Sequence, residues 1–305
     1  MNTNDRPPIS TQSIAKTGAL YALLAYISWG LLPIYWKFFG QVPAVEVLCH
    51  RMIWSMVFLA GILIVQQRKA EIIQLWRSPQ KLGLLFLTAA LLTFNWGLYI
   101  YGVNTDRVVE TSLGYFINPL VNVLLGFVFL KERLNLSQTI AVLLASIGVA
   151  YFVWQFGQVP WIALGLAFSF AFYGLVRKVV SVAPMVGLAG ETLLIAPMAL
   201  ALVSYWAITG VGHLGTNSWI TLLFIGAGVT TSMPLLWFNN AAKRLRLSTL
   251  GFFQYLAPSI QLALGIFLYR EPFTHTHAVT FGCIWSALLI YSLSSLLQSR
   301  KEQPI

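Results

Sequence analysis

Two stretches of the chain decide its fold: residues 112–132, SLGYFINPLVNVLLGFVFLKE, and residues 249–271, TLGFFQYLAPSIQLALGIFLYRE. Both contain the pattern Pro-x6-Gly-x5-Glu, which begins at Pro119 in the first stretch and at Pro258 in the second. The offset of about 139 residues is close to half of the 305-residue chain. Similarity at such an offset indicates an internal repeat.

Both stretches belong to long apolar runs, of which the chain has ten. Only 9% of its residues are charged, whereas a soluble globular protein has roughly 25%. A helix that spans a bilayer needs about 20 apolar residues. The runs lie at about residues 17–39, 43–65, 82–103, 108–130, 136–154, 159–178, 186–207, 217–239, 247–269 and 275–297. The pattern excludes a soluble enzyme, a disordered chain and a coiled coil, and continuous runs argue against a β-barrel.

The repeat divides the ten runs into two units of five, at residues 17–154 and 159–297, with cytoplasmic tails at 1–16 and 298–305. Because five is odd, the second unit enters the membrane from the opposite side, so the units are inverted copies. We therefore expect an all-α integral membrane protein of ten transmembrane helices in two inverted five-helix repeats. Such repeats are typical of secondary transporters. The alternative is a passive channel or a non-transporting membrane signalling protein.

The charges of the chain indicate its sidedness. Of the 19 lysines and arginines, all fall on one side of the ten-run topology except Lys37, Arg51, Arg107 and Arg270. Positive residues stay on the cytoplasmic side during insertion, so both termini are expected there. The net charge of +10 then reflects topology, with the lipid bilayer and its anionic headgroups as partner. No nucleic acid is expected, because no fold presents a basic run.

Polar side chains recur at helical spacing in the two repeated stretches. Tyr115, Asn118 and Asn122 share one helical face of the first, and Gln254 and Gln261 share one of the second. Amides in hydrocarbon are costly unless they are paired or face water. These amides therefore either line a central cavity or form hydrogen bonds between helices. The same faces carry four hinge candidates: Pro119, Gly126, Pro258 and Gly265.

The third run adds Asn95 and Tyr99 on one helical face, with Trp96 beside them. Together with Trp29 of the first run and Tyr255 of the ninth, they would complete the polar lining and aromatic walls of a substrate pathway. Trp29 is alternatively an anchor at the membrane interface. A pathway with amides and few fixed charges suits a small zwitterionic or amphipathic solute.

Acidic residues within the runs are candidates for proton coupling. Glu46 and His50 are four residues apart and therefore adjacent on a helix, and Glu191 occupies the corresponding run of the second unit. A carboxylate partly removed from water binds a proton more readily. The alternative is that Glu46 and Arg51 simply lie at the water interface.

Sequence motifs of enzymes are absent. The chain has no Walker loop, no HExxH and no nucleophile elbow. We therefore expect no enzyme activity, cofactor or metal site, and no obligate protein partner is evident. Cys49 and Cys283 lie in apolar runs and are expected to be buried small side chains. Glu132 and Glu271, each following a cation at the end of a run, are expected to be structural helix-end pairs.

Several motifs are shared with a known family. They are Ser28-Trp29-Gly30, Glu46-x3-His50-Arg51-x3-Ser55, Asn95-Trp96-x2-Tyr99, GYFINPL at 114–120, KERL at 131–134 and LGFFQYLAP at 250–258. In their order and spacing they resemble the EamA-domain proteins of the drug/metabolite transporter superfamily, and within these the RarD branch. The resemblance covers essentially the whole chain except both tails.

This resemblance implies a carrier of the bacterial inner membrane, often an exporter of metabolites or amino-acid-like compounds. It also implies a central cavity lined mainly by the first, third, fourth, sixth, eighth and ninth spans. Glu46 and Glu191, on the second and seventh spans, would then lie nearer the periphery.

Overall fold

The computed structural model describes residues 11–131, 134–180, 182–242, 244–245 and 253–301, and every regular element within them is a helix. The helices are α1 (Thr11–Lys37), α2 (Ala44–Val65), α3 (Lys69–Trp76), α4 (Pro79–Asn104), α5 (Val108–Leu130), α6 (Leu136–Phe156), α7 (Trp161–Val179), α8 (Pro184–Thr209), α9 (Ser218–Ala242), α11 (Leu256–Ala263), the π-helix η1 (Leu264–Leu268) and α12 (His275–Lys301). The all-helical class predicted from the sequence is confirmed for these residues.

Eight of the described helices are long and apolar enough to cross a membrane. Two further apolar helices, Trp161–Arg177 and Leu256–Leu268, are shorter. They lie within the sixth and ninth predicted runs, and the start of the ninth, residues 247–252, falls outside the described part of the chain. The sequence did not predict α3, because its eight residues are too few for a periodic pattern to be recognised.

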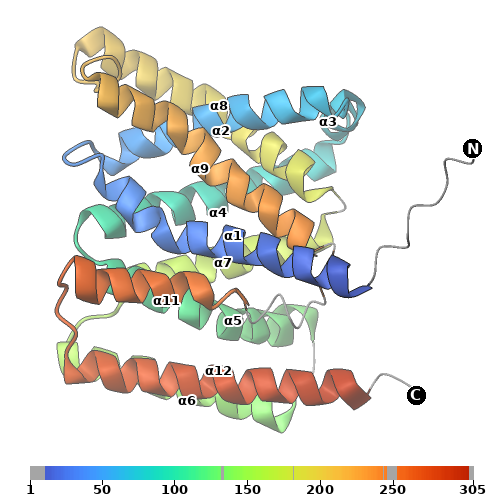
Figure 1. Ribbon diagram of the computed structural model, residues 1–305, viewed down its shortest axis with the longest axis vertical. Coiled ribbons are helices and arrows are strands. Elements are labelled where there is room, and N and C mark those ends of the chain that lie inside the picture. The colour runs from blue at the N-terminus through green and yellow to red at the C-terminus, as the bar shows by residue number, and fades with distance from the viewer. Residues whose placement is uncertain (1–10, 132–133, 181, 243, 246–252, 302–305) are drawn as a thin grey trace, which may run out of the picture.

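The long helices lie side by side in one bundle (Figure 1). Helices α6 and α12 pack together along one edge, and α2, α3 and α8 lie at the opposite edge. Between them, α9 packs against both α1 and α2, and α7 packs against both α4 and α5. The first turn of α1 and the last turn of α12 lie on the same side of the bundle (Figure 1).

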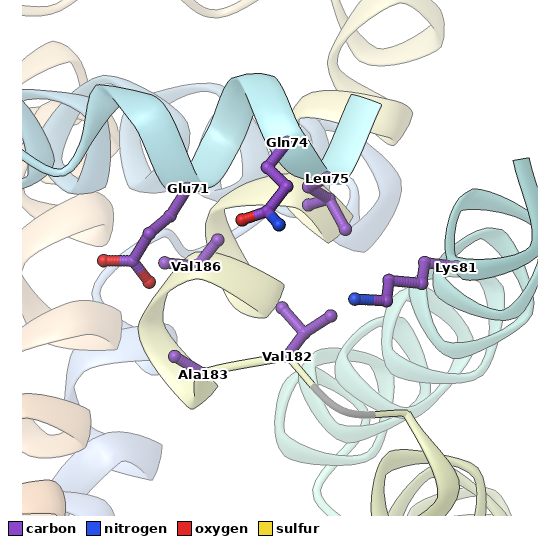
Figure 2. Close-up of a pocket in the computed structure, with 7 residues that line it drawn as sticks. All are labelled: Glu71, Gln74, Leu75, Lys81, Val182, Ala183 and Val186. Carbon is purple, nitrogen blue, oxygen red and sulfur yellow. The ribbon is translucent and has the colours of Figure 1, made fainter. Parts of the chain in front are cut away.

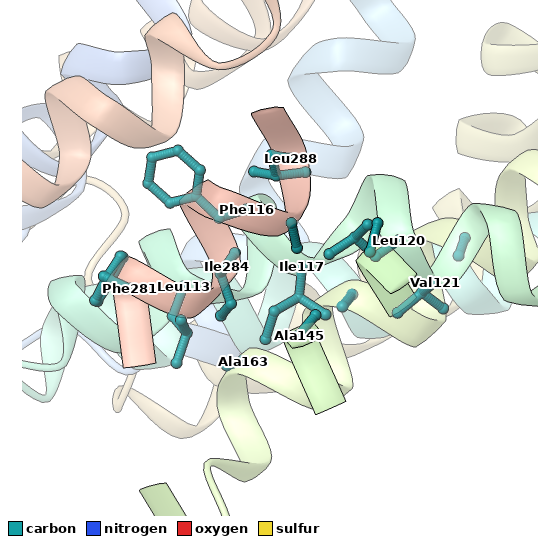
Figure 3. Packing of buried hydrophobic residues seen from close by; sticks show 14 of the residues in the cluster. Leu113, Phe116, Ile117, Leu120, Val121, Ala145, Ala163, Phe281, Ile284 and Leu288 are labelled. Carbon is teal, nitrogen blue, oxygen red and sulfur yellow. The ribbon is translucent and has the colours of Figure 1, made fainter. Parts of the chain in front are cut away.

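One interior cluster joins α5 to α6, α7 and α12 (Figure 3). Large side chains of α5 pack against alanines of the neighbouring helices. Ala145 of α6 and Ala163 of α7 are almost fully buried in this cluster. Small residues let helices approach closely in a membrane. The outer surface is also apolar: Trp154 and Phe267 are each 80% exposed. Such a surface is costly in water and favourable against lipid.

A glycine sets the distance between α2 and α9. A Cβ added to Gly228 of α9 would collide with the backbone of Trp54 and Ser55 of α2. The two helices therefore touch backbone to backbone at this point. Thr231 follows Gly228 by almost one turn, so the close approach carries its hydroxyl toward α2.

We expect Gly228→Ala to destabilise the protein by roughly 1–3 kcal/mol, because the added methyl forces two packed backbones apart. Thermal unfolding in detergent measures this change. The control is Gly61→Ala on α2, where an added Cβ would meet nothing within 4 Å. Equal unfolding midpoints for the two variants would contradict the close approach.

Candidate functional site

Two amides of α5 form a short chain of hydrogen bonds toward α7. Asn118 donates from Nδ2 to the carbonyl oxygen of Ala167 at 3.0 Å. Asn122 donates from Nδ2 to Oδ1 of Asn118 at 3.1 Å. Asn118 is buried and Asn122 is exposed, so the chain runs from the interhelical contact outward.

Asn95 and Gln261 also bond to carbonyls of neighbouring helices. Nδ2 of Asn95 lies 3.0 Å from the carbonyl oxygen of Leu166 and 2.9 Å from Oγ of Ser169. Nε2 of Gln261 donates to the carbonyl oxygen of Trp29 at 3.1 Å, while its Oε1 is buried without a partner. The amides of α4, α5 and α11 thus connect helices, which was one of the two alternatives left open by their spacing.

The candidate aromatic walls separate into different contacts. Trp29 packs against Tyr26 and Phe238, with ring centroids 5.2 and 5.8 Å apart. Tyr255 stacks on Phe116 of α5 at 6.5 Å, and the half-buried Gln254 lies next to it in the chain. These residues belong to helix packing around α1 and α11.

The remaining aromatic candidates, Trp96, Tyr99 and Tyr115, lie around Arg51. Arg51 was expected at the outer water interface, yet its residue is only 4% exposed. Its Cζ lies 3.8 Å from the ring centroid of Trp96 and 4.9 Å from that of Trp36. Its Nε donates to Oγ1 of Thr231 at 2.9 Å. The close approach of α9 to α2 makes this bond geometrically accessible.

Tyrosines also surround the Arg51 guanidinium. Tyr99 and Tyr115 are close enough to interact with it electrostatically, and their rings meet edge to face at 5.7 Å. Nη1 of Arg51 and Oη of Tyr99 are both buried without a hydrogen-bond partner. We call Arg51, Trp36, Trp96, Tyr99, Tyr115 and Thr231 the arginine cluster. A charge within an apolar run was the sequence signal that could have identified Arg51.

Glu46 has a different partner from the one expected. Its two carboxylate oxygens accept from the backbone N–H and pair with Nδ1 of His213, each at 2.7 Å. His213 lies in the connection between α8 and α9. His50, the predicted partner, instead stacks on Phe224 at 3.8 Å. The Glu46 carboxylate still interacts electrostatically with His50, four residues further along α2.

Glu191 is fully surrounded by polar partners. Its carboxylate accepts from Oγ1 of Thr88 at 2.7 Å and from Oη of Tyr173 at 3.3 Å. Nη1 of Arg177 lies 3.8 Å from the same carboxylate. Glu191 is 1% exposed, and these contacts join α8 to α4 and α7.

Two carboxylates cap helices of the opposite half of the chain. Glu271, in the connection before α12, accepts from the backbone N–H groups of Val108 and Val109 at 2.7 and 2.8 Å. Burial raises the pKa of Glu271, and these two hydrogen bonds act against that rise. Glu110 of α5 accepts from the N–H of Ile162, at the start of α7, at 3.0 Å.

These caps refine the expected helix-end role. Glu271 was expected to pair with the cation before it, but it binds the positive end of α5, where four N–H groups lack helical partners. Glu132 lies outside the described residues.

The hinge candidates fall in unlike settings. Pro119 and Gly126 lie inside α5, where proline removes one helical hydrogen bond. Pro258 lies in the first turn of α11, where no such bond is lost. Gly265 lies in η1, a π-helical turn of the kind often found at functional sites.

A small cavity of about 90 Å³ opens elsewhere, between α3, the start of α4 and the start of α8 (Figure 2). It is lined by Glu71, Gln74, Leu75, Lys81, Val182, Ala183 and Val186. None of these is a sequence-predicted site residue. Within the described residues, no group of three or more His, Cys, Asp or Glu side chains could hold a metal ion.

We expect Glu271→Ala to lower the free energy of unfolding by about 0.5–2 kcal/mol, because the first N–H groups of α5 lose their acceptor. Glu271→Gln keeps one acceptor oxygen and should lose less. Thermal unfolding in detergent measures both. Glu71→Gln is the control, because this partly exposed glutamate of α3 pairs only with Arg68 at the surface, where an ion pair contributes little. An unfolding midpoint unchanged in Glu271→Ala would show that the cap contributes nothing.

Known proteins resemble the chain in sequence and in fold. The model of the EamA-like transporter family matches residues 16–154. A protein RarD of Salmonella typhi is 46% identical, over 94% of this chain and 98% of that protein. An uncharacterized transporter of Vibrio cholerae is also 46% identical, over 93% of this chain and 95% of that protein. A solved crystal structure, 18% identical, covers 90% of this chain and 97% of its own with a TM-score of 0.60, which is a likeness of fold alone.

Proposed function

Because the chain belongs to the EamA-like transporter family and is of the RarD type, we propose that it is a secondary carrier that exports a small metabolite, amino-acid-like compound or drug by alternating access. Membership makes it a multi-pass membrane protein of a bacterial transporter family. The proposal adds a mechanism, a direction and a solute class. It needs neither cofactor nor obligate protein partner.

Helix packing supports two inverted five-helix repeats. If the second unit copies the first, α7, α8, α9, α11 and α12 correspond to α1, α2, α4, α5 and α6. The contact of α1 with α9 then has its counterpart in that of α7 with α4. The contact of α1 with α11 has its counterpart in that of α7 with α5. The pairs α2–α8, α5–α11 and α6–α12 are their own counterparts, as a twofold axis requires.

Local geometry repeats in the same way. Lys131 and Arg270, the cations before the repeated glutamates, both have left-handed backbone conformations with φ of 55°. Gln261 bonds to the backbone of Trp29, and the corresponding Asn122 lies next to Gly174 of α7. The family match at residues 16–154 agrees with a first unit at 17–154, which leaves 159–297 as the second.

The orientation is proposed from charge. With both termini in the cytoplasm, the basic residues of the α2–α4 connection and of the tails face the cytoplasmic leaflet, whose anionic lipids attract them. The bilayer of the bacterial inner membrane is then the main partner. Inverted halves that meet at a central axis provide the two exchangeable conformations that alternating access requires.

The observation that carries the proposal is the meeting of helices from both halves around unsatisfied polar atoms in the arginine cluster. Counterflow of labelled solute in proteoliposomes tests it, with a panel of amino acids and drugs at imposed pH gradients. A carrier shows saturable uptake accelerated by unlabelled solute inside. Flux without saturation or counterflow would indicate a channel, and no flux of any solute would favour a signalling protein.

Asn118→Ala should reduce counterflow to the level of empty liposomes, because it releases α5 from α7 at the contact between halves. Expression should stay close to that of the unaltered protein, and stability should fall by only about 1 kcal/mol, the contribution of one interhelical hydrogen bond. Ser146→Ala is the matched control, since this exposed hydroxyl bonds only within α6. Normal counterflow in Asn118→Ala would remove this residue from the site.

We further propose that Glu46, together with His213, couples transport to protons. His50 and Glu191 are further candidates. The Glu46 carboxylate is buried while the imidazole of His213 is 39% exposed, so protons can enter from the aqueous side. Glu46→Gln should abolish the acceleration of uptake by a pH gradient and preserve counterflow at equal pH. The control is Glu71→Gln. Gradient-driven uptake that persists in Glu46→Gln would exclude this pair.

A further inference from the structure

We infer that Arg51 binds the carboxylate group of the transported solute, which places the solute among amino acids and other small carboxylates. The inference rests on the proposed carrier function and specifies its substrate class. It follows from two features of Arg51 taken together: no ion pair among the described residues includes this buried cation, and its Nη1 has no hydrogen-bond partner.

Burial makes the missing counter-charge costly. Arg51 is 4% exposed within a candidate membrane span, and none of the ion pairs found among the described residues includes it. An unpaired buried charge carries a large desolvation penalty. The nearest acid along α2, Glu46, has both oxygens engaged by His213. A ligand with a negative charge would supply the missing counter-charge of Arg51.

The groups that face the guanidinium are neutral and come from several helices. Tyr35, Tyr99 and Tyr115 of α1, α4 and α5 are the titratable ones. Thr231 of α9 accepts a hydrogen bond from Nε of Arg51, and Nη1 of Arg51 has no acceptor. These helices belong to both proposed halves, so a ligand here contacts the elements that would move.

Geometry favours a carboxylate over a halide. The ring of Trp96, 3.8 Å away, stacks with the guanidinium and restricts its rotation, so its free N–H keeps one direction. Directed N–H groups of arginine match planar carboxylate oxygens. The unpartnered hydroxyl of Tyr99 offers a second donor. The aromatic rings around these donors suit the apolar remainder of a small solute.

The first experiment measures binding by purified protein in detergent. Each L-amino acid and a set of small monocarboxylates, including benzoate, are compared with their primary amides through the shift of the unfolding midpoint and the apparent affinity. At least one carboxylate should bind roughly tenfold or more tightly than its amide, as expected for a hydrogen bond to a charged group. Replacing gluconate by chloride at constant ionic strength tests whether the site binds a halide instead.

Variants then assign the preference to Arg51. Arg51→Gln should remove the difference between acid and amide, and Arg51→Lys should retain part of it. Thr231→Val removes the acceptor of Arg51 Nε and should weaken the binding of acids more than that of amides. This variant replaces Arg51→Gln in the test if Arg51→Gln does not fold. Arg244→Gln is the control and should change nothing, because this exposed arginine lies beyond the end of α9 and bonds to Asn240.

Three outcomes would overturn the inference: no preference for any acid over its amide, the same preference in folded Arg51→Gln or Thr231→Val, or displacement by chloride alone. Counterflow separates this from the carrier proposal. Saturable counterflow of a solute without a carboxylate, undiminished in Arg51→Gln, would keep the carrier and reject the carboxylate site. Carboxylate binding that depends on Arg51 without any counterflow would do the reverse.

Discussion

Polar atoms inside an apolar bundle must find partners within the protein, and the arrangement of this chain follows from that constraint. Hydrocarbon offers no hydrogen bonds, so an unpaired N–H or carboxylate is costly there. Apolar packing alone does not select one register, because lipid tails are as apolar as leucine. The hydrogen bonds of Asn95, Asn118 and Gln261 to carbonyls of neighbouring helices specify which helices meet and at what height.

The buried charges differ in how far the protein meets this constraint. Glu191 is satisfied by Thr88, Tyr173 and Arg177 from two neighbouring helices. Arg51 is equally removed from solvent, yet its strongest contacts are an aromatic ring and one hydroxyl. Stacking on tryptophan stabilises a cation without neutralising it. The protein thus keeps a positive charge in place and available at the contact between α2, α4 and α9.

Much of the fold could be predicted from the sequence, because its signals are local. Hydropathy over about 20 residues located the helices, and the repeated Pro-x6-Gly-x5-Glu pattern indicated two related halves. The partners of polar side chains were less accessible. Helical spacing brought Glu46 next to His50, but the contact with His213 depends on how a distant loop folds back. The sequence offered a position at the water interface as the alternative for Arg51, because helical spacing alone does not show whether a side chain points into the bundle.

The reciprocal caps have a consequence for how the protein is made. Glu271 completes the start of α5, and Glu110 on α5 completes the start of α7. The ribosome releases the first half long before it reaches Glu271. Until Glu271 has been made, the first N–H groups of α5 lack this acceptor, so the first half is not complete although its own helices are present. Each half therefore supplies an acceptor that completes a helix of the other, and the native structure of either half requires both.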